Sequence, residues 1–278
     1  MLYEEGLMAR KIGFIGVGNM ANAIIGGMTS KGGVPFADIV LYDRLVDKCA
    51  SFAALGATVA QSEADVATAA DVIVLAVKPQ NFPELLATLS TVADINRKVI
   101  VTIAAGITVE TVSSALHNAS VVRVLPNTPM LIGMGVSVIC RSDVVARDDF
   151  DFVVSMFEAS GRVMLIDEGE MNRIISVTSS SPAYVFAFIK AICDGAAAQG
   201  LSGSEILPAV CDVVIGSALL LKQGAKSPEE QISVVTSKGG TTERAMAVLQ
   251  EQDLYGMIEE AMKACTRRAE ELSGHQAD

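Results

Sequence analysis

The stretch from Lys11 to Ala21, which reads KIGFIGVGNMA, decides how this chain folds. Its first half is an apolar run without polar alternation, typical of a strand buried on both faces of a parallel sheet. Its second half fits the pattern G-x-G-x-x-A between a strand and a helix. There Gly16 allows a tight turn, Gly18 lets the backbone approach a pyrophosphate, and Ala21 lets the helix pack closely on the strand. The stretch predicts a dinucleotide-binding site, with a glycine-rich turn that only packs as the alternative.

Six more short apolar runs follow, most of them rich in Val and Ile, and segments long enough for crossover helices lie between several of them. Alternating strands and helices imply an α/β fold with a Rossmann-type, doubly wound and mainly parallel sheet. We expect residues 1–167 to form this dinucleotide-binding domain. The six runs are Ile39–Tyr42, Val72–Val77, Val99–Ile103, Val121–Leu125, Val136–Cys140 and Val163–Ile166.

The pattern changes after Asp167, where strand-like runs stop and apolar residues recur at helical spacing. We therefore expect residues 168–278 to form an all-helical C-terminal domain. Its helices are apolar over wide faces for so small a domain. Because an apolar face without a partner inside the chain needs one outside, the sequence predicts an obligate dimer.

Composition and charge exclude several classes of protein. The 278 residues include 21 basic and 32 acidic ones, a net charge of −11, whereas nucleic-acid binding needs a basic surface. The long uncharged runs Ile12–Ser30 and Val124–Cys140 contain Gly, Asn or Pro and do not read as transmembrane spans. Met1–Glu5 lacks the pattern of a secretory signal, so we expect a cytoplasmic protein. Five scattered cysteines and two histidines predict neither a metal site nor a Ser-His-Asp hydrolase.

Three charged residues at strand ends bear on cofactor binding. Asp43 would accept hydrogen bonds from an adenosine ribose, which favours NAD, whereas Arg44 would pair with a 2′-phosphate, which favours NADP. The two residues thus favour different cofactors, and a solvated surface charge is the alternative interpretation of Arg44. Lys78 follows the Val72–Val77 strand, whose carboxyl end places it near the cofactor. A surface lysine at a helix start is the alternative there.

Two loops carry further polar groups. Pro126-Asn127-Thr128-Pro129 ends a strand, and its prolines fix a rigid loop with an amide and a hydroxyl aimed into the ligand crevice. Ser237-Lys238-Gly239-Gly240-Thr241-Thr242 precedes a helix-like run, and its glycines, hydroxyls and helix N-terminus would form an anion cradle that suits a substrate carboxylate. Ordinary turn chemistry is the alternative for both loops.

Taken together, these motifs resemble the pyrroline-5-carboxylate reductase family over nearly the whole chain. The order and spacing of five motifs make the resemblance far more specific than any one of them. They are FIGVGNM at 14–20, VKP at 77–79, RVLPNTP at 123–129, SPAY at 181–184 and SKGGTT at 237–242.

The resemblance implies the last step of proline biosynthesis, in which NADPH or NADH gives a hydride to the C=N carbon of 1-pyrroline-5-carboxylate to form L-proline. It implies that Gly239, Gly240 and Thr241 hold the substrate carboxylate through backbone N–H groups. Ser237 belongs to the same loop, and Thr242 would hydrogen-bond the ring nitrogen. The residues implied to contact the dinucleotide are Gly16, Gly18, Asn19, Met20, Val77, Lys78, Pro79, Asn127 and Thr128.

The resemblance also implies how the chain assembles. The helical C-terminal domain would serve dimerisation and substrate binding. Family members form homodimers through it and often assemble further into rings of dimers. The active site would lie between the nucleotide domain of one subunit and helices of its partner.

The chain departs from the family pattern in three places, and these bear on substrate affinity. Ser179 and Ser181 replace the glycines of Ser-Gly-Ser-Gly-Pro-Ala-Tyr, Gln231-Ile232-Ser233 replaces Leu-Lys-Asp, and Lys238 replaces the proline of Ser-Pro-Gly-Gly. Two other interpretations stay open. One is a dinucleotide-binding sensor without turnover. The other is an oxidoreductase like the β-hydroxyacid dehydrogenases, which would use a lysine such as Lys190 on a long helix.

Overall fold

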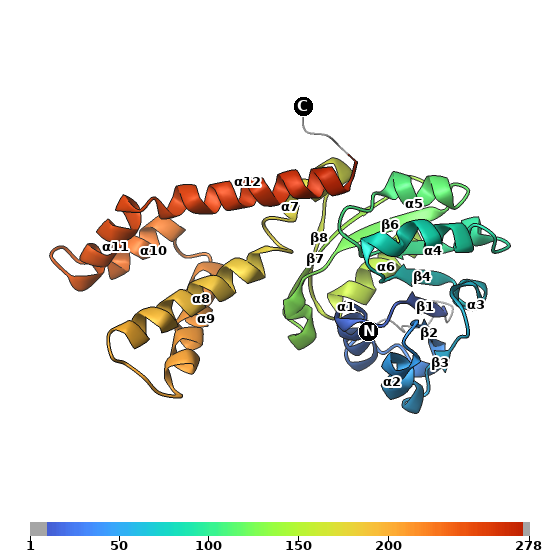
Figure 1. Ribbon diagram of the computed structural model, residues 1–278, viewed down its shortest axis with the longest axis horizontal. Helices are drawn as coiled ribbons and strands as arrows, with labels where there is room; N and C mark the ends of the chain where they lie inside the picture. Colours follow the sequence, from blue (N-terminus) through green and yellow to red (C-terminus); the bar gives the residue numbers. More distant parts are fainter. Residues whose placement is uncertain (1–9, 275–278) are drawn as a thin grey trace. The chain divides into compact units, whose positions relative to one another are not determined.

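The computed structural model describes residues 10–274, so the prediction made on Met1–Glu5 lies outside the described residues. The described chain forms two compact units. The first runs to Ser180 and resumes at Cys265, and the second is Ser181–Ala264. Figure 1 shows the elements of both units in the colours of the sequence.

The first unit is built on an eight-stranded sheet with the order β3-β2-β1-β4-β5-β6-β7-β8. Neighbouring strands are parallel except β6 and β7, which are antiparallel. All seven predicted runs form strands, which confirms the mainly parallel, doubly wound sheet; the two-residue edge strand β3 was not expected. The strands are β1 Ile12–Ile15, β2 Ile39–Tyr42, β3 Thr58–Val59, β4 Val72–Leu75, β5 Val99–Thr102, β6 Ser120–Leu125, β7 Gly135–Arg141 and β8 Gly161–Leu165.

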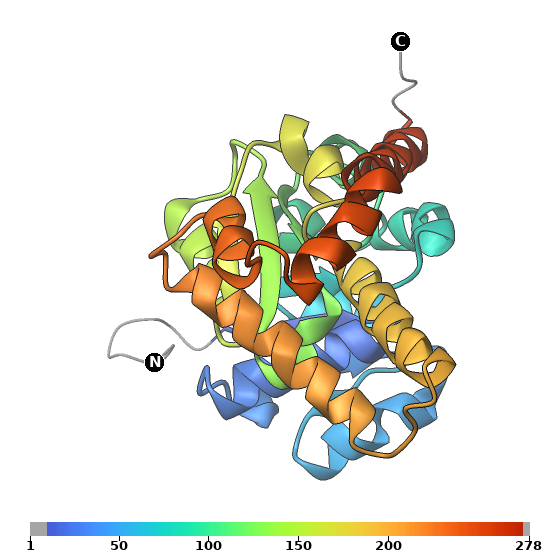
Figure 2. The ribbon, with the colours of Figure 1, turned by 90° about the vertical axis from the view of Figure 1, so that its left-hand side faces the viewer.

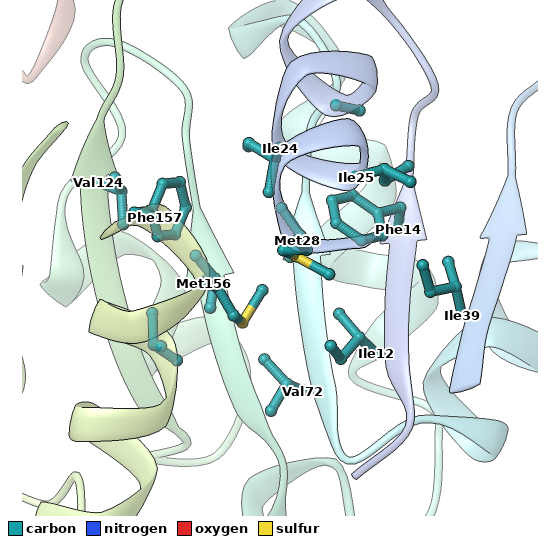
Figure 3. Packing of buried hydrophobic residues seen from close by; sticks show 14 of the residues in the cluster. Ile12, Phe14, Ile24, Ile25, Met28, Ile39, Val72, Val124, Met156 and Phe157 are labelled. Carbon is teal, nitrogen blue, oxygen red and sulfur yellow. The ribbon is translucent and has the colours of Figure 1, made fainter. Parts of the chain in front are cut away.

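Both faces of this sheet are covered because its strands are apolar on both sides. Successive residues of a strand point to opposite faces. Phe14 packs in the cluster of Figure 3 with Met28 and Phe157, whereas Ile15 belongs to the cluster on the other face with Leu86. The helices of this unit are α1 Asn19–Ser30, α2 Ala50–Ala54, α3 Glu63–Ala69, α4 Phe82–Leu89, α5 Val109–Ala115, α6 Arg147–Glu158 and α7 Met171–Ile174, and the 3₁₀ turns are η1 Phe36–Asp38, η2 Val46–Cys49, η3 Pro79–Asn81, η4 Ile95–Arg97, η5 Thr128–Ile132 and η6 Glu168–Glu170.

The second unit is helical, which confirms the expected change of pattern after the sheet. Helices α8 and α9 contact each other along this unit (Figure 2). Neither α8 nor α9 has a buried residue in the single chain. Within residues 10–274, no helix is both long and apolar enough to cross a membrane. The helices are α8 Ser181–Ala198, α9 Ile206–Lys222, α10 Pro228–Val235, α11 Thr241–Glu251 and α12 Leu254–Leu272, of which the part from Cys265 onward belongs to the first unit.

The division into compact units differs from the predicted domain boundary between residues 167 and 168. Met171 and Ile175, which follow that boundary, are buried in the core of the first unit. Ala269, near the end of α12, is buried in the same cluster. The chain therefore leaves the first unit at Ser180 and rejoins it at Cys265, because these side chains are part of its core.

A buried arginine joins the sheet to the chain segments that follow it. Arg123 on β6 is only 1 % exposed. Its Nη1 lies 3.4 Å from Oε1 of Glu168, and its Nη2 donates to Oδ1 of Asn172 at 3.1 Å. The same Oδ1 accepts a hydrogen bond from the hydroxyl of Ser273 at 3.1 Å. The network holds the residues beyond α12 against the sheet of the first unit.

Candidate functional site

The carboxyl ends of β1, β2, β4 and β5 meet at one edge of the sheet, where the strand order reverses. β1 pairs with β2 on one side and with β4 on the other. In open sheets of this kind, ligands bind in the crevice outside these strand ends. The predicted glycine turn, Asp43, Arg44 and Lys78 all follow these strands, so the topology brings them together.

Two cavities that share part of their lining lie at this edge. The first has a volume of about 510 Å³ and the second about 320 Å³. Ala76, Val77 and Lys78 line both, so the cavities form one groove that runs past the end of β4. The first is lined by Gly16, Gly18, Asp43, Arg44, Lys48 and Glu63, among others. The second is lined by Met20, Pro79, Ile103, Ala104, Pro126 and Ser179, among others.

The glycine turn has the backbone that close approach to a phosphate requires. Gly16 has φ = +98°, and its N–H donates to the carbonyl of Tyr42 at 2.8 Å. A Cβ at Gly16 would lie 2.6 Å from the carbonyl oxygen of Ala76, whereas a Cβ at Gly18 would meet no atom within 4 Å. Gly18 is the N-cap of α1, whose first turn contains no acidic residue. The start of this helix therefore has open space beside Gly18, and its own first turn carries no carboxylate that would compete for the N–H groups.

The next two predicted contacts begin α1. Asn19 is its first residue and is exposed, and Met20 is half-buried and lines the second cavity. The helix N-terminus thus stands between the two parts of the groove.

Asp43 is turned toward the protein. Its Oδ2 accepts from the N–H of Val17 at 2.8 Å and from Nζ of Lys48 at 3.2 Å, and its Oδ1 accepts from the N–H of Leu45 at 2.9 Å. Burial by itself would raise the pKa of Asp43, but these hydrogen bonds outweigh burial and lower the pKa. Through its hydrogen bond with Val17, the carboxylate therefore holds the glycine turn against the end of β2.

Arg44 faces outward, and its side chain is 56 % exposed. Its Nη2 donates to Oε2 of Glu84 at 2.7 Å, and its Nε lies 3.9 Å from Oε1 of Glu63. The hydrogen bond and charge of Glu84 raise the pKa of Arg44, which therefore stays cationic.

The loop after β6 differs from its predicted role in one respect. Asn127 is buried, and its amide donates to the carbonyl of Thr178 at 3.0 Å and accepts from the N–H of Val136 at 2.9 Å. The expectation that this side-chain amide points into the crevice is wrong, because both of its polar atoms bind the protein. Thr128 is exposed at the start of η5, and Pro126 lines the second cavity.

Several lining residues were not singled out from the sequence. Ile103 and Ala104 follow β5, and the rule that strand ends line the crevice would have found them. Lys48 and Glu63 line the first cavity from beyond β2 and from the start of α3, and no sequence signal marks them. Ser179, by contrast, was noted in the sequence as a departure from the family pattern; it lines the second cavity, and its buried hydroxyl has no hydrogen-bond partner among the described residues.

The second unit carries the predicted substrate loop. Gly239 has φ = +76°, and the N–H of Gly240 donates to the carbonyl of Ser237 at 2.9 Å. The N–H of Gly239 donates to Oε2 of Glu243 at 2.8 Å. Acceptors of the chain itself thus already occupy two of the predicted donors, the carboxylate of Glu243 that of Gly239 and the carbonyl of Ser237 that of Gly240.

Helix α11 begins at Thr241, with Gly240 as its N-cap. The N–H groups of Thr241 and Thr242 have no acceptor within the helix, because they belong to its first turn. Thr241 is exposed, and Thr242 is half-buried. These two amides remain suited to an anion.

Two further predictions concern Lys190 and metal binding. The ammonium of Lys190 is exposed and donates to Asp194 at 2.5 Å, so it is held in an ion pair on its own helix. Over residues 10–274, no group of His, Cys, Asp and Glu is arranged to hold a metal ion.

Comparison with known proteins bears on the whole chain. A family model described as pyrroline-5-carboxylate reductase dimerisation matches residues 168–272, and one described as NADP oxidoreductase, coenzyme F420-dependent, matches residues 11–106. The pyrroline-5-carboxylate reductase of Escherichia coli strain K12 is 35% identical over 269 residues, which are 96% of this chain and 99% of that protein. This chain belongs to the pyrroline-5-carboxylate reductase family. The family match confirms the resemblance drawn from the five motifs, and the dimerisation model supports oligomer formation.

Solved structures agree with this membership in the pyrroline-5-carboxylate reductase family. A reductase of this name from Coxiella burnetii is 30% identical, covers 96% of this chain and 99% of its own, and has a TM-score of 0.86. The Plasmodium falciparum pyrroline carboxylate reductase, solved with NADP bound, shares the fold with a TM-score of 0.87 at 23% identity, over 96% of this chain and 100% of its own.

Proposed function

We propose that this protein reduces 1-pyrroline-5-carboxylate to L-proline by transferring a hydride from NADPH or NADH to the C=N carbon. The observation that carries the proposal is the 35% identity, over nearly the full length of both chains, to a reductase of this name. The groove at the edge of the sheet supports it with a geometry that suits a dinucleotide.

The residues of the groove fit a nicotinamide dinucleotide. The open space at Gly18 and the uncapped N-terminus of α1 suit a pyrophosphate, which Gly16, Gly18, Asn19 and Met20 would hold. Val77, Lys78 and Pro79 would contact the dinucleotide where the two cavities meet. When bound, the nicotinamide supplies the hydride. The remaining work, which is binding and alignment, is done by the chain.

The loop of the second unit would hold the substrate. We assign the substrate carboxylate to the N–H of Thr241 and to that of Gly239, which Glu243 would release, with Gly240 and Ser237 shaping the turn. The hydroxyl of Thr242 would hydrogen-bond the ring nitrogen as the imine becomes an amine. An imine is basic enough to arrive protonated, so its reduction needs alignment of donor and acceptor more than a strong acid. This agrees with the scarcity of histidine in the chain.

Asn127 would position the loop that follows β6. Its two hydrogen bonds hold the loop after β6 against Thr178 and Val136. We propose that this loop, with Thr128 exposed on it, contacts the dinucleotide through its backbone and the Thr128 hydroxyl rather than through the Asn127 amide.

We propose a homodimer through the C-terminal helices, in which the loop of one subunit serves the groove of the other. The uncovered apolar faces of α8 and α9 support it. A ring of such dimers stays a prediction. The cytoplasm, too, stays a prediction.

The test is consumption of NADPH or NADH, followed at the nicotinamide absorbance, with 1-pyrroline-5-carboxylate and the purified protein. Thr242→Ala should lose most of the rate, Thr242→Ser should restore much of it, and Thr68→Ala on α3 is the matched control. Tight cofactor binding without any turnover by the folded wild type would favour the sensor interpretation instead.

A further inference from the structure

The two cavities of the groove differ in the side chains that line them. Charged side chains, Asp43 and Arg44 among them, line much of the first cavity. The second cavity is mainly apolar. Among the described residues that line it, only Lys78, which both cavities share, and Ser179 have polar side chains. In an apolar ligand site, a few polar groups of this kind fix the orientation of the ligand.

The hydroxyl of Ser179 is buried, yet it has no hydrogen-bond partner among the described residues. Leaving a buried polar group unpaired costs stability. Other hydroxyls of the same turn are paired: that of Ser176 donates to the carbonyl of Arg173 at 2.9 Å, and that of Thr178 donates to the carbonyl of Ile174 at 3.1 Å. The free hydroxyl of Ser179, at the wall of a cavity, therefore points to a ligand.

The backbone around Ser179 is held in place from both sides. Its N–H donates to the carbonyl of Ile175 at 3.1 Å, and Ile175 is buried in the core of the first unit. The carbonyl of Thr178 accepts from the amide of Asn127 at 3.0 Å. A hydroxyl on such a backbone binds a ligand at a small cost in entropy, because the chain that carries it is already ordered.

The nicotinamide ring is the part of a dinucleotide that suits the second cavity. In a fold of this type the dinucleotide spans the crevice, with its ribose near the end of the second strand and its pyrophosphate at the first helix. Gly18 has open space for the pyrophosphate, and Met20, two residues further, lines the second cavity. The nicotinamide half therefore follows into this cavity. Its ring is flat and largely apolar, and its carboxamide both donates and accepts hydrogen bonds, as a hydroxyl does.

We propose that the hydroxyl of Ser179 hydrogen-bonds the carboxamide of the bound nicotinamide and thereby sets the orientation of the ring. The carboxamide projects from one side of the ring, so holding it fixes which face of the ring lies against the protein. The family pattern has glycine at this position, which has no side chain to offer, so the contact belongs to this chain's own sequence. The inference rests on the dinucleotide part of the proposed function and does not depend on the substrate.

The test separates the nicotinamide ring from the rest of the cofactor. The ligands are NADPH or NADH, whichever the wild type binds more tightly, and the matching ADP-ribose with or without a 2′-phosphate, which lacks only the ring. Both are titrated by calorimetry into the full-length wild type and Ser179→Ala, without pyrroline substrate. We expect Ser179→Ala to bind the whole cofactor about threefold to tenfold more weakly, the scale of one neutral hydrogen bond, and to bind the ADP-ribose unchanged. Without cofactor it should melt no lower than the wild type, because it loses an unpaired buried group.

Ser176→Ala is the control, because it removes a buried hydroxyl from the same turn that lines neither cavity, and it should change neither titration. Three results would overturn the proposal: unchanged binding of the whole cofactor by Ser179→Ala, an equal loss of cofactor and ADP-ribose binding, or a lower Tm of cofactor-free Ser179→Ala, which would show that the hydroxyl serves the fold. Binding of neither ligand by the wild type would overturn it together with the dinucleotide site. If the expected titrations are found but no pyrroline substrate is reduced, the proposed function fails and this inference stands.

Discussion

Replacing Gly16 by alanine tests whether the glycine turn has the geometry on which cofactor binding depends. At φ = +98° an alanine is strained, and its Cβ would lie 2.6 Å from the carbonyl oxygen and 2.8 Å from the carbonyl carbon of Ala76. Ala76 cannot easily withdraw, because its N–H donates to the carbonyl of Ile15 at 2.8 Å, next to the β1–β4 pairing. The methyl group therefore meets backbone that the sheet holds in place.

The magnitude follows from two contributions. A left-handed backbone conformation costs an L-residue about 1–2 kcal/mol. Overpacking adds about 1–3 kcal/mol. We expect Gly16→Ala to lower the free energy of unfolding by roughly 3 kcal/mol and Tm by roughly 10 °C. The assay is thermal unfolding followed by circular dichroism without cofactor.

Gly18→Ala is the matched variant, two residues along the same turn. Its backbone, at φ −92° and ψ −173°, accepts an alanine, and the added Cβ meets nothing within 4 Å. We expect a change in stability within about 1 kcal/mol, the scale of an N-cap substitution. NADPH binding should weaken at least about tenfold, because the methyl group stands where the pyrophosphate approaches. The reasoning is refuted if Gly16→Ala melts like the wild type, or if Gly18→Ala binds NADPH as the wild type does.

Four further outcomes are expected. Arg123→Ala should lower the free energy of unfolding in urea by about 2–4 kcal/mol, because it leaves a cavity and unpaired partners, whereas Arg123→Met should lose less, because it fills the cavity and leaves only the partners unpaired; equal losses would contradict this. Because hydrogen bonds lower the pKa of Asp43 despite its burial, the stability it contributes is present at neutral pH and lost as the pH falls below about 4. Asp43→Asn should therefore flatten the acid side of the plot of Tm against pH, and an unchanged slope would count against the fastening role. Glu243→Gln should lower the KM for 1-pyrroline-5-carboxylate by about twofold to fivefold, since a neutral amide competes less well for the N–H of Gly239, and a higher KM would show that the carboxylate only holds the loop. Gly18→Ala and Thr242→Ala subunits can be mixed, dissociated and reassociated. If each site takes its groove and its loop from different subunits, half of the dimers are mixed and one of their two sites is intact, so about a quarter of the wild-type rate should return. If each site takes both from one subunit, no activity should return.

The strands could be predicted from the sequence because buried parallel strands are continuously apolar. β3 was missed because Thr58–Val59 is only two residues long and pairs with β2 alone. The reversed direction of β7 could not be read either, since an apolar run carries no direction. The short connection through η5, after Leu125, is compatible with an antiparallel neighbour and not with a parallel one, which needs a longer crossover.

From the sequence, the candidate site could be predicted only by the rule that ligands bind outside the carboxyl ends of parallel strands. Strand register places Tyr42 beside Ile15, and Asp43 therefore comes next to the glycine turn. The sequence left Asp43 and Arg44 as equal alternatives, because it does not say which hydrogen-bond donors a carboxylate will meet. For the same reason the amide of Asn127 was expected to face a ligand, whereas the folded chain offers it Val136 and Thr178.

The helical unit shows a different limit of sequence reasoning. The helical spacing of apolar residues predicted the helices of this unit, including α8 and α9. Such spacing shows which face of a helix is apolar but not what covers that face. In the single chain Phe186, Phe188, Val213 and Ile215 are each at least half exposed, whereas the sheet of the first unit has apolar cores on both of its faces. Apolar area on this scale is stable in water when a partner covers it, and stability gained by association depends on protein concentration. The first unit therefore buries its apolar side chains by its own packing, whereas the proposed dimer would cover the exposed apolar faces of the helical unit.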